Sequence, residues 1–310
     1  MGHYLVTGGA GFIGSHLAEN LINAHQHVFI IDNLSTGSVT NIPQQATYIT
    51  DSVLASLPHL KYLTLDGIFH LGAPSSTPMY RENPALVGEA ILDFIYLMEH
   101  ARREKIKVVF ASSSSVYNKC PIPWKEDMPL HPTDFYTEGR ICWERIARIY
   151  YDQYGTKSIG LRFFSVYGPR EEFKKQYANV ITQMLWAKLK GESFEVFGDG
   201  EQRRDCTFVS DIVEALILAM KSEISCDIFN IGTGKNYSTN EIAHKQGVKI
   251  KYVPVPFVNY VDTTLADISK AERVLGFKAK VALDEGLKRL YDWTYSSHPK
   301  VMAPVVKGNQ

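Results

Sequence analysis

Short apolar runs alternate with longer amphipathic stretches through the first half of the chain. Short runs bounded by glycine or polar residues are typical of buried strands, and apolar residues at helical spacing indicate helices. We expect strands at 4–6, 27–31, near 48–49, 67–71, 107–111 and 159–163, and helices at about 84–103 and 135–154. This alternation predicts an α/β fold, a doubly wound parallel sheet of the Rossmann type with helices on both faces.

The regular alternation fades in the second half. Ser238 and Glu241 have the spacing of a capping box that opens a short helix. Further helices are expected at about 177–190, 211–221, 269–275 and 283–296. We therefore expect a Rossmann domain over 1–168 and, over 169–310, mainly a smaller α/β substrate lobe, with some segments returning to the main sheet. The lobe would close over the carboxyl ends of the strands, where such sheets bind ligands.

A glycine-rich turn directly follows the first predicted strand. Gly8 permits the tight turn, Gly11 lets the backbone approach a pyrophosphate, and Gly14 allows close packing of helix against strand. Asp32 ends the second strand 18 residues after Gly14, where a carboxylate would hold an adenosine ribose. Because the same charge would repel a 2′-phosphate, the pattern predicts a site for NAD in preference to NADP.

Composition mainly excludes other classes of function. Of the 310 residues, 45% are hydrophobic and 21% charged, and the formal net charge is zero, so neither a nucleic acid nor a membrane surface is an expected partner. We see neither a run of about 18 apolar residues nor a secretory signal. The four cysteines have no paired or metal-like spacing. We therefore expect reduced thiols, no metal site and a cytoplasmic protein.

Hydroxyl groups and a guanidinium gather beyond the predicted strand at 107–111. Ser112 to Ser115 follow this strand, Tyr136 begins a helix about 20 residues later, and Arg140 comes one turn further on. Residues at i and i+4 share a helix face, so phenol and guanidinium would be neighbours. A fixed cation lowers the pKa of a phenol from its reference value of about 10. Two plainer interpretations stay open, a serine-rich loop and an ordinary helix N-terminus with a surface arginine.

Over nearly its whole length the chain resembles the extended short-chain dehydrogenase/reductases, specifically the NAD-dependent nucleotide-sugar epimerases and dehydratases. The resemblance rests on TGGAGFIGSH at 7–16, DNLSTG at 32–37, HLGA at 70–73, ASSSSVY at 111–117, FYTEGR at 135–140, LRFFSVYGPR at 161–170, FGDGEQRRD at 197–205 and ADISKA at 266–271.

The resemblance implies which residues form the site. The implied catalytic residues are Ser113, Tyr136 and Arg140. The implied contacts of NAD are Gly8, Gly11, Phe12, Ile13, Gly14, Asp32, Asn33, Ser35, Thr36, Gly37, Asp51, Ser52, Leu71, Gly72, Ala73, Tyr136 and Arg140. The implied contacts of the nucleotide-sugar substrate are Ser75, Ser113, Ser114, Ser165, Asn179, Val180 and Arg204.

Family members commonly form homodimers by packing two helices against their symmetry mates, which here would be those at about 84–103 and 135–154. We therefore expect a homodimer, although the same apolar faces would equally serve to cover the sheet.

Within the family, the serine run favours one reaction. The 4,6-dehydratases have an Asp-Glu pair where this chain has Ser114 and Ser115, and decarboxylating relatives use a Glu at the second position. Serines do not supply that acid and base at neutral pH. The expected reaction is therefore 4-epimerisation of a UDP-hexose through a transient 4-keto intermediate.

Three departures from the family pattern keep other functions open. Arg140 stands where the family has Lys, Ser165 where many members have Asn, and Phe257 near the place of a second diphosphate-binding Arg. The alternatives are a sugar-nucleotide oxidoreductase or dehydratase and a weakly active, NAD-binding regulatory protein. Because arginine keeps the charge of lysine, we expect Arg140→Lys to retain or raise turnover and Arg140→Met to weaken both NAD retention and turnover.

Overall fold

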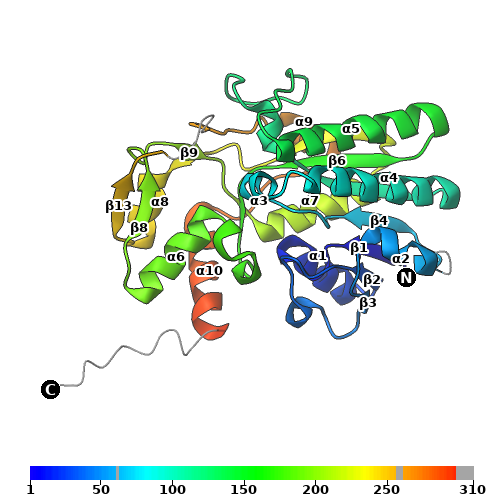
Figure 1. Ribbon diagram of the computed structural model, residues 1–310, viewed down its shortest axis with the longest axis horizontal. Helices are drawn as coiled ribbons and strands as arrows, with labels where there is room; N and C mark the ends of the chain where they lie inside the picture. Colours follow the sequence, from blue (N-terminus) through cyan, green and yellow to red (C-terminus); the bar gives the residue numbers. More distant parts are fainter. Residues whose placement is uncertain (61–62, 256–260, 298–310) are drawn as a thin grey trace.

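A parallel sheet forms the centre of the computed structural model, which describes residues 1–60, 63–255 and 261–297. Among these residues the sheet has seven strands in the order β11-β6-β5-β4-β1-β2-β3, and every neighbouring pair is parallel (Figure 1). The strands are β1 (His3–Thr7), β2 (His27–Ile31), β3 (Thr47–Ile49), β4 (Gly67–His70), β5 (Lys107–Ser113), β6 (Ser158–Phe163) and β11 (Cys226–Ile231). The predicted doubly wound α/β fold is confirmed.

Helices bury apolar side chains against both faces of this sheet. One face is covered by α1 (Phe12–Asn23), α7 (Val209–Lys221) and α9 (Ser269–Leu275). The other is covered by α2 (Val53–Leu60), α4 (Leu86–Glu104) and α5 (Phe135–Tyr154), and the short α3 (Thr77–Glu82) packs on α5. Strands buried on both faces have the continuous apolar runs seen in the sequence.

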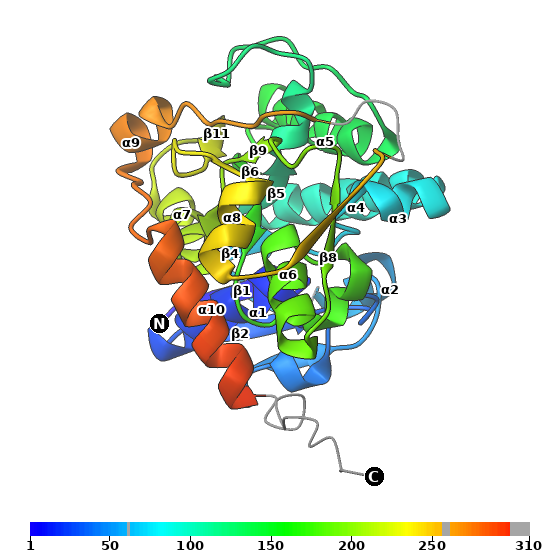
Figure 2. The same cartoon turned by 90° about the vertical axis from the view of Figure 1, so that its left-hand side faces the viewer.

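A second lobe sits beside the sheet and faces the viewer in Figure 2. Its helices are α6 (Val180–Lys190), α8 (Thr239–Gln246) and α10 (Leu283–Ser297), which share one apolar core with the first residue of α1. Its paired strands are β8 (Phe194–Phe197) with β13 (Ile250–Val253), β9 (Arg203–Arg204) with β12 (Tyr237–Ser238), and β7 (Val166–Tyr167) with β10 (Thr207–Phe208). Short 3₁₀ turns are η1 (Val39–Asn41), η2 (Ser114–Tyr117) and η3 (Glu172–Tyr177).

Several helices were predicted with accurate bounds, and one was predicted to start too early. Helices α5 and α9 have the expected bounds, and the capping box at Ser238 and Glu241 opens α8. Helix α6, in contrast, begins at Val180 and not at 177, because the Asn179 side chain accepts a hydrogen bond from the Ile181 N–H and so fixes the start. No strand was predicted at the residues of β11, although some segments of the second half were expected to return to the main sheet. Strand β11 returns to this sheet beside β6.

None of the helices in the described ranges has both the length and the apolar character that are needed to cross a lipid bilayer.

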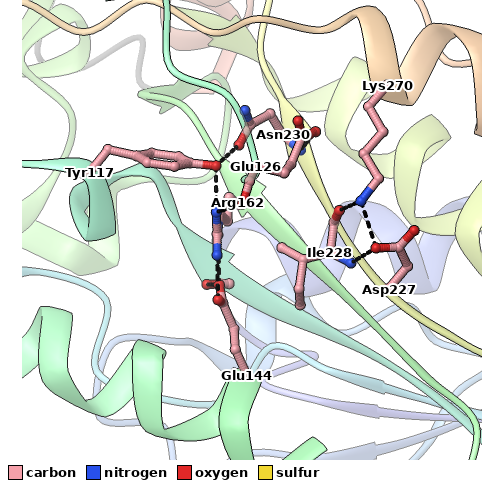
Figure 3. A network of polar contacts seen from close by, with 9 residues as sticks. Tyr117, Glu126, Glu144, Arg162, Asp227, Ile228, Asn230 and Lys270 are labelled. Atoms are coloured by element: carbon pink, nitrogen blue, oxygen red, sulfur yellow. Dashed lines mark hydrogen bonds and ion pairs between the residues drawn. The ribbon is translucent and has the colours of Figure 1, made fainter. Parts of the chain in front are cut away.

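A buried ion pair fastens α5 to the sheet (Figure 3). Glu144 of α5 receives two hydrogen bonds from Arg162 of β6, at 2.6 and 2.8 Å, and the two side chains are 6% and 4% exposed. Ser112 of β5 donates to the same carboxylate. Arg162 also donates to the Tyr117 hydroxyl, which in turn donates to the Asn230 Oδ1 of β11 at 2.7 Å. The network therefore joins α5 to three strands of the sheet.

Removing one partner of this pair leaves a buried charge without compensation. We expect Arg162→Met to lower the free energy of unfolding by about 3–5 kcal/mol, measured by urea denaturation. A matched control is Arg148→Met, since Arg148 pairs with Asp152 on the surface, with side chains 62% and 50% exposed. This variant should lose less than about 1 kcal/mol. Equal losses in the two variants would contradict the anchoring role of the buried pair.

Candidate active site

A cleft of about 550 Å³ opens at the carboxyl ends of the central strands. Its walls come from the segments that follow β1 to β6 and, on the opposite side, from the second lobe. This is the edge at which open parallel sheets bind ligands.

The glycine turn forms one end of the cleft. Gly8 has a φ of +71°, and its carbonyl accepts a hydrogen bond from the Gly11 N–H at 3.1 Å. A Cβ at Gly14 would lie 2.1 Å from the Gly8 oxygen, so only glycine allows this close approach. Gly11 is the N-cap of α1 and supplies no side-chain cap. The N–H groups of the first turn therefore stay available, and the geometry fits a phosphate.

Asp32 lies beside this turn at the end of β2. Its carboxylate accepts hydrogen bonds from the Ala10 N–H at 3.0 Å and the Leu34 N–H at 2.8 Å, and the residue is 9% exposed. Burial is the largest influence and raises the pKa of this carboxyl, while the main-chain donors act to lower it. The carboxylate is thus fixed at the cleft wall, where it fits the hydroxyls of a ribose.

The structure brings nearly all of the expected cofactor residues to the cleft. Those that line it are Gly8, Gly11, Phe12, Ile13, Gly14, Asp32, Asn33, Ser35, Thr36, Asp51, Ser52, Leu71, Gly72, Ala73, Tyr136 and Arg140. Gly37 is not among the lining residues. A Cβ there would lie 2.8 Å from the backbone of Ala10, so packing alone accounts for this glycine.

Ser113 stands at the end of β5, where its hydroxyl is part of a short chain of hydrogen bonds. The Ser113 Oγ accepts from the Ser115 N–H at 3.2 Å and from the Ser115 hydroxyl at 3.0 Å. The Ser115 oxygen accepts from the Thr137 hydroxyl of α5 at 3.2 Å. Because the Ser113 oxygen is used as an acceptor, its own O–H can donate into the cleft.

Tyr136 lies in the first turn of α5, on the cleft wall. Asp134 fixes this end of the helix, since its carboxylate accepts from the Thr137 N–H at 2.8 Å and from the Thr77 hydroxyl of α3 at 3.1 Å. The Tyr136 ring packs at 5.6 Å from the ring of Tyr80, also of α3. The phenol is thus positioned from both α5 and α3.

Arg140 lies one turn further along α5 and is buried. Its guanidinium carbon lies 5.0 Å from the centroid of the Tyr136 ring and 4.3 Å from that of Trp143. The two terminal nitrogens donate to carbonyls of different segments, to Pro74 at 3.0 Å and to Ala111 at 3.4 Å. The arginine therefore acts as a fork that holds the ends of β4 and β5 beside α5, in addition to placing a charge next to the phenol.

An uncharged histidine packs behind this arginine. His70 is fully buried, its Nδ1 is 2.8 Å from the Thr7 hydroxyl, and its ring lies 4.6 Å from that of Trp143. Burial, with a smaller contribution from Arg140, lowers the pKa of His70 to about 3. The guanidinium thus has no competing cation behind it at neutral pH.

Two expected anchors of the nucleotide are hydrogen-bonded to the main chain. Asn179 donates to the Val166 carbonyl at 3.0 Å, and Arg204 donates to the carbonyls of Val261 and Asp262 at 2.6 and 3.2 Å. Among the expected substrate residues, those that line the cleft are Ser75, Ser113, Ser114, Ser165, Asn179 and Arg204. Val180 begins α6 and is not a lining residue, and Phe257 lies outside the described residues.

Sequence reasoning missed several residues of the cleft wall. They include Thr7, Met79, Glu89, Asp93, Lys174, Tyr177, Val261 and Thr264. Glu89 and Asp93 are four residues apart on α4, a spacing that could have indicated a shared face. Lys174 and Tyr177 lie in the 3₁₀ segment, which has no periodic signal. Within the described ranges, no group of three or more His, Cys, Asp or Glu residues could hold a metal ion.

Comparisons with known proteins agree with this geometry. Residues 4–232 match the model of the NAD dependent epimerase/dehydratase family. A protein of Methanocaldococcus jannaschii named "Putative UDP-glucose 4-epimerase" is 35% identical over 300 residues, which cover 93% of this chain and 97% of that protein. The UDP-N-acetyl-alpha-D-glucosaminuronate decarboxylase of Bacillus cytotoxicus is 32% identical over 316 residues, with 93% and 96% covered.

A solved structure is also similar throughout. The UDP-glucose 4-epimerase of Thermotoga maritima, crystallised with UDP-glucose, superposes with a TM-score of 0.90 at 31% identity. The match covers 95% of this chain and 99% of that one.

The fork made by Arg140 predicts a cost for the conservative replacement. Lysine keeps the charge but lacks the planar pair of donors that reaches two carbonyls. We expect Arg140→Lys to lower the free energy of unfolding by about 1–3 kcal/mol, since one of the two carbonyls then loses its charged donor, while turnover is retained. Urea denaturation measures the first quantity and an activity assay the second. Wild-type stability in Arg140→Lys would contradict the fork.

Proposed function

The chain belongs to the NAD-dependent epimerase/dehydratase family, and we propose that it is a nucleotide-sugar 4-epimerase that acts on a UDP-hexose. The observation that best supports this is one shared cleft, lined by the glycine turn and Asp32 at one end and by Ser113 and Tyr136 at the other. A dinucleotide laid across the carboxyl ends of the strands from Asp32 would extend toward these two hydroxyls.

In the proposed reaction, the glycine turn and Asp32 would hold NAD, which would supply reversible hydride transfer at the sugar C4, so that the carbon can be inverted through a 4-keto sugar. Tyr136 removes the proton of the C4 hydroxyl as the general base. Ser113 donates a hydrogen bond to the same oxygen. The positive charge of Arg140, held 5.0 Å from the centre of the Tyr136 ring, attracts the negative charge that the phenol oxygen carries after its proton leaves.

The end of β5 argues against the other reactions of the family. Ser114 and Ser115 carry no carboxylate, and the Ser115 hydroxyl is engaged with Ser113 and Thr137. A dehydratase needs an additional acid and base to eliminate water, and serines are poor substitutes at neutral pH. Epimerisation needs only one base that gives its proton back. The hydroxyl set at this strand end is therefore sufficient for the proposed reaction.

We also propose that the protein is a homodimer in the cytoplasm. Support comes from apolar side chains that α4 and α5 leave exposed, among them Leu92, Tyr96, Phe135 and Ile149. The four cysteines are unpaired, as in a reducing compartment. Sedimentation equilibrium of the wild type, with Ile149→Glu as the disrupted control, tests the dimer. A monomeric wild type would refute it.

The reaction itself is tested by incubating the protein with a panel of UDP-sugars and resolving the products by NMR. Conversion of a UDP-hexose into its C4 epimer without consumption of NAD or NADH supports the proposal. Stoichiometric consumption of NADH with a keto-sugar would identify an oxidoreductase, and release of CO₂ from a UDP-uronic acid a decarboxylase. Either of these results would replace the epimerase assignment.

The two cleft hydroxyls should differ in their effect on turnover. Tyr136→Phe removes the base, so we expect a loss of about 10²–10⁴-fold in turnover with NAD still bound. Ser113→Ala removes one hydrogen bond and should cost less. Unchanged epimerisation by Tyr136→Phe would exclude this mechanism, and the NAD content of each variant, read from its absorbance after denaturation, controls for cofactor loss.

The fixed carboxylate of Asp32 should select the cofactor. A 2′-phosphate would meet this buried charge, whereas ribose hydroxyls can donate to it. We expect NAD to bind at least about tenfold more tightly than NADP, a difference of about 1.4 kcal/mol. Titration calorimetry measures both affinities, and equal values would rule out this role for Asp32.

A further inference from the structure

Three basic side chains line the cleft among the residues that the structure describes: Arg140, Lys174 and Arg204. The guanidinium of Arg140 is held by the carbonyls of Pro74 and Ala111, and that of Arg204 by the carbonyls of residues 203, 261 and 262. Lys174 differs from both, because its ammonium is held by a carboxylate. Because an ammonium on a flexible side chain has three donors, Lys174 can bind an anionic ligand as well as this carboxylate, and no main-chain contact has to break.

Lys174 reaches the cleft from the second lobe and ends beside the glycine turn. Its ammonium nitrogen lies 5.6 Å from the centroid of the Phe12 ring. Phe12 is the first residue of α1 and directly follows Gly11, whose position as N-cap leaves the first-turn N–H groups available. The cation and this helix terminus therefore border the same end of the cleft from opposite sides.

A buried carboxylate holds the lysine in this position. Glu171 accepts from the Lys174 ammonium at 3.1 Å, and its own side chain is fully buried. The same carboxylate accepts from the Asn179 N–H at 3.1 Å and from the Thr182 hydroxyl of α6. Glu171 thus keeps two further donors when the ammonium turns toward a ligand. Glu171 therefore orients the Lys174 ammonium and leaves it further N–H donors for a ligand.

The backbone on both sides of Lys174 also adopts unusual conformations. Ser165, Arg170 and Lys175 have φ values of +24°, +69° and +51°, which non-glycine residues seldom adopt. Such conformations persist where the surrounding structure enforces them, and they cluster at ligand sites. We therefore infer that the surrounding contacts, among them those of Glu171, hold the segment that carries Lys174 beside the cleft.

We propose that Lys174 is a second-lobe ligand of the dinucleotide's diphosphate, which it binds together with the N-terminus of α1. Within the described part of the chain, the cleft wall carries four carboxylates, those of Asp32, Asp51, Glu89 and Asp93, so a diphosphate there needs a nearby positive charge. The diphosphate of a nucleotide sugar has the same chemistry. The contact with Phe12 places the lysine at the dinucleotide's end of the cleft.

The test is titration calorimetry with NAD on the full chain freed of nucleotide, comparing wild type, Lys174→Met and Lys174→Arg. We expect Lys174→Met to weaken NAD binding about tenfold or more, which corresponds to about 1.4 kcal/mol, and Lys174→Arg to stay within about threefold of wild type. The affinity of wild type should also fall more steeply with ionic strength than that of Lys174→Met, because a charge pair has been removed.

Matched measurements separate this role from a structural one. Lys175→Met is the control variant, since Lys175 is exposed and is not a lining residue, and it should bind NAD as wild type does. Adenosine, which lacks the diphosphate, should bind wild type and Lys174→Met equally. If the single variant fails to fold with Glu171 unpaired, Glu171→Gln/Lys174→Met removes both charges and should show the same loss of NAD affinity.

Three results would overturn the proposal. Unchanged NAD affinity in Lys174→Met would mean that the ion pair with Glu171 is only structural. An equal loss of adenosine affinity would show a general distortion of the cleft. A loss of affinity for UDP, with NAD binding intact, would assign the lysine to the diphosphate of the nucleotide sugar.

Discussion

The buried pair of Glu144 and Arg162 is the constraint on which the geometry of the site depends. Glu144 lies two turns beyond Tyr136 and one turn beyond Arg140 on α5, so the three side chains share a helix face. Fixing Glu144 to β6, and through Ser112 to β5, sets the rotation of α5 about its axis. A buried charge tolerates only a complete set of partners, so this setting is enforced more strictly than apolar packing alone would enforce it.

The second lobe contains a comparable buried carboxylate of its own. Glu171 is a buried carboxylate that gathers the N–H of Asn179, the hydroxyl of Thr182 and the ammonium of Lys174. It thereby fixes the start of α6 and the 3₁₀ turn before it. Each side of the cleft thus has its own buried carboxylate, one behind the wall that carries Ser113 and Tyr136 and one behind the second-lobe wall. The spacing of the two walls follows from these anchors and from the apolar core beneath them.

Features that are decided by neighbouring residues could be predicted from the sequence, whereas contacts between distant segments could not. The glycine turn, the capping box at Ser238 and the bounds of α5 could be predicted because each is decided within a few residues. The hydrogen bonds of Arg140 to Pro74 and Ala111 join segments 66 and 29 residues away, and no spacing in the sequence indicates them. Strand β11 was missed for the same reason, since its place beside β6 is a property of the sheet. Lys174 lies in an irregular turn, where residue type alone indicates nothing.

The side chains around Arg140 give a physical reason for an arginine at the position where the family has lysine. Trp143 stacks on Phe94 with ring centroids 4.9 Å apart, and the guanidinium carbon of Arg140 lies 4.3 Å from the centroid of the Trp143 ring. A flat, delocalised cation fits between this ring and that of Tyr136, whereas a compact ammonium would leave space there. Arginine thus gives the site a cation whose orientation is fixed by its protein contacts. In the proposed reaction, a charge that is already in place would require little reorganisation as negative charge develops on the phenol. Preorganisation of this kind supports the proposed role of Tyr136 as the base.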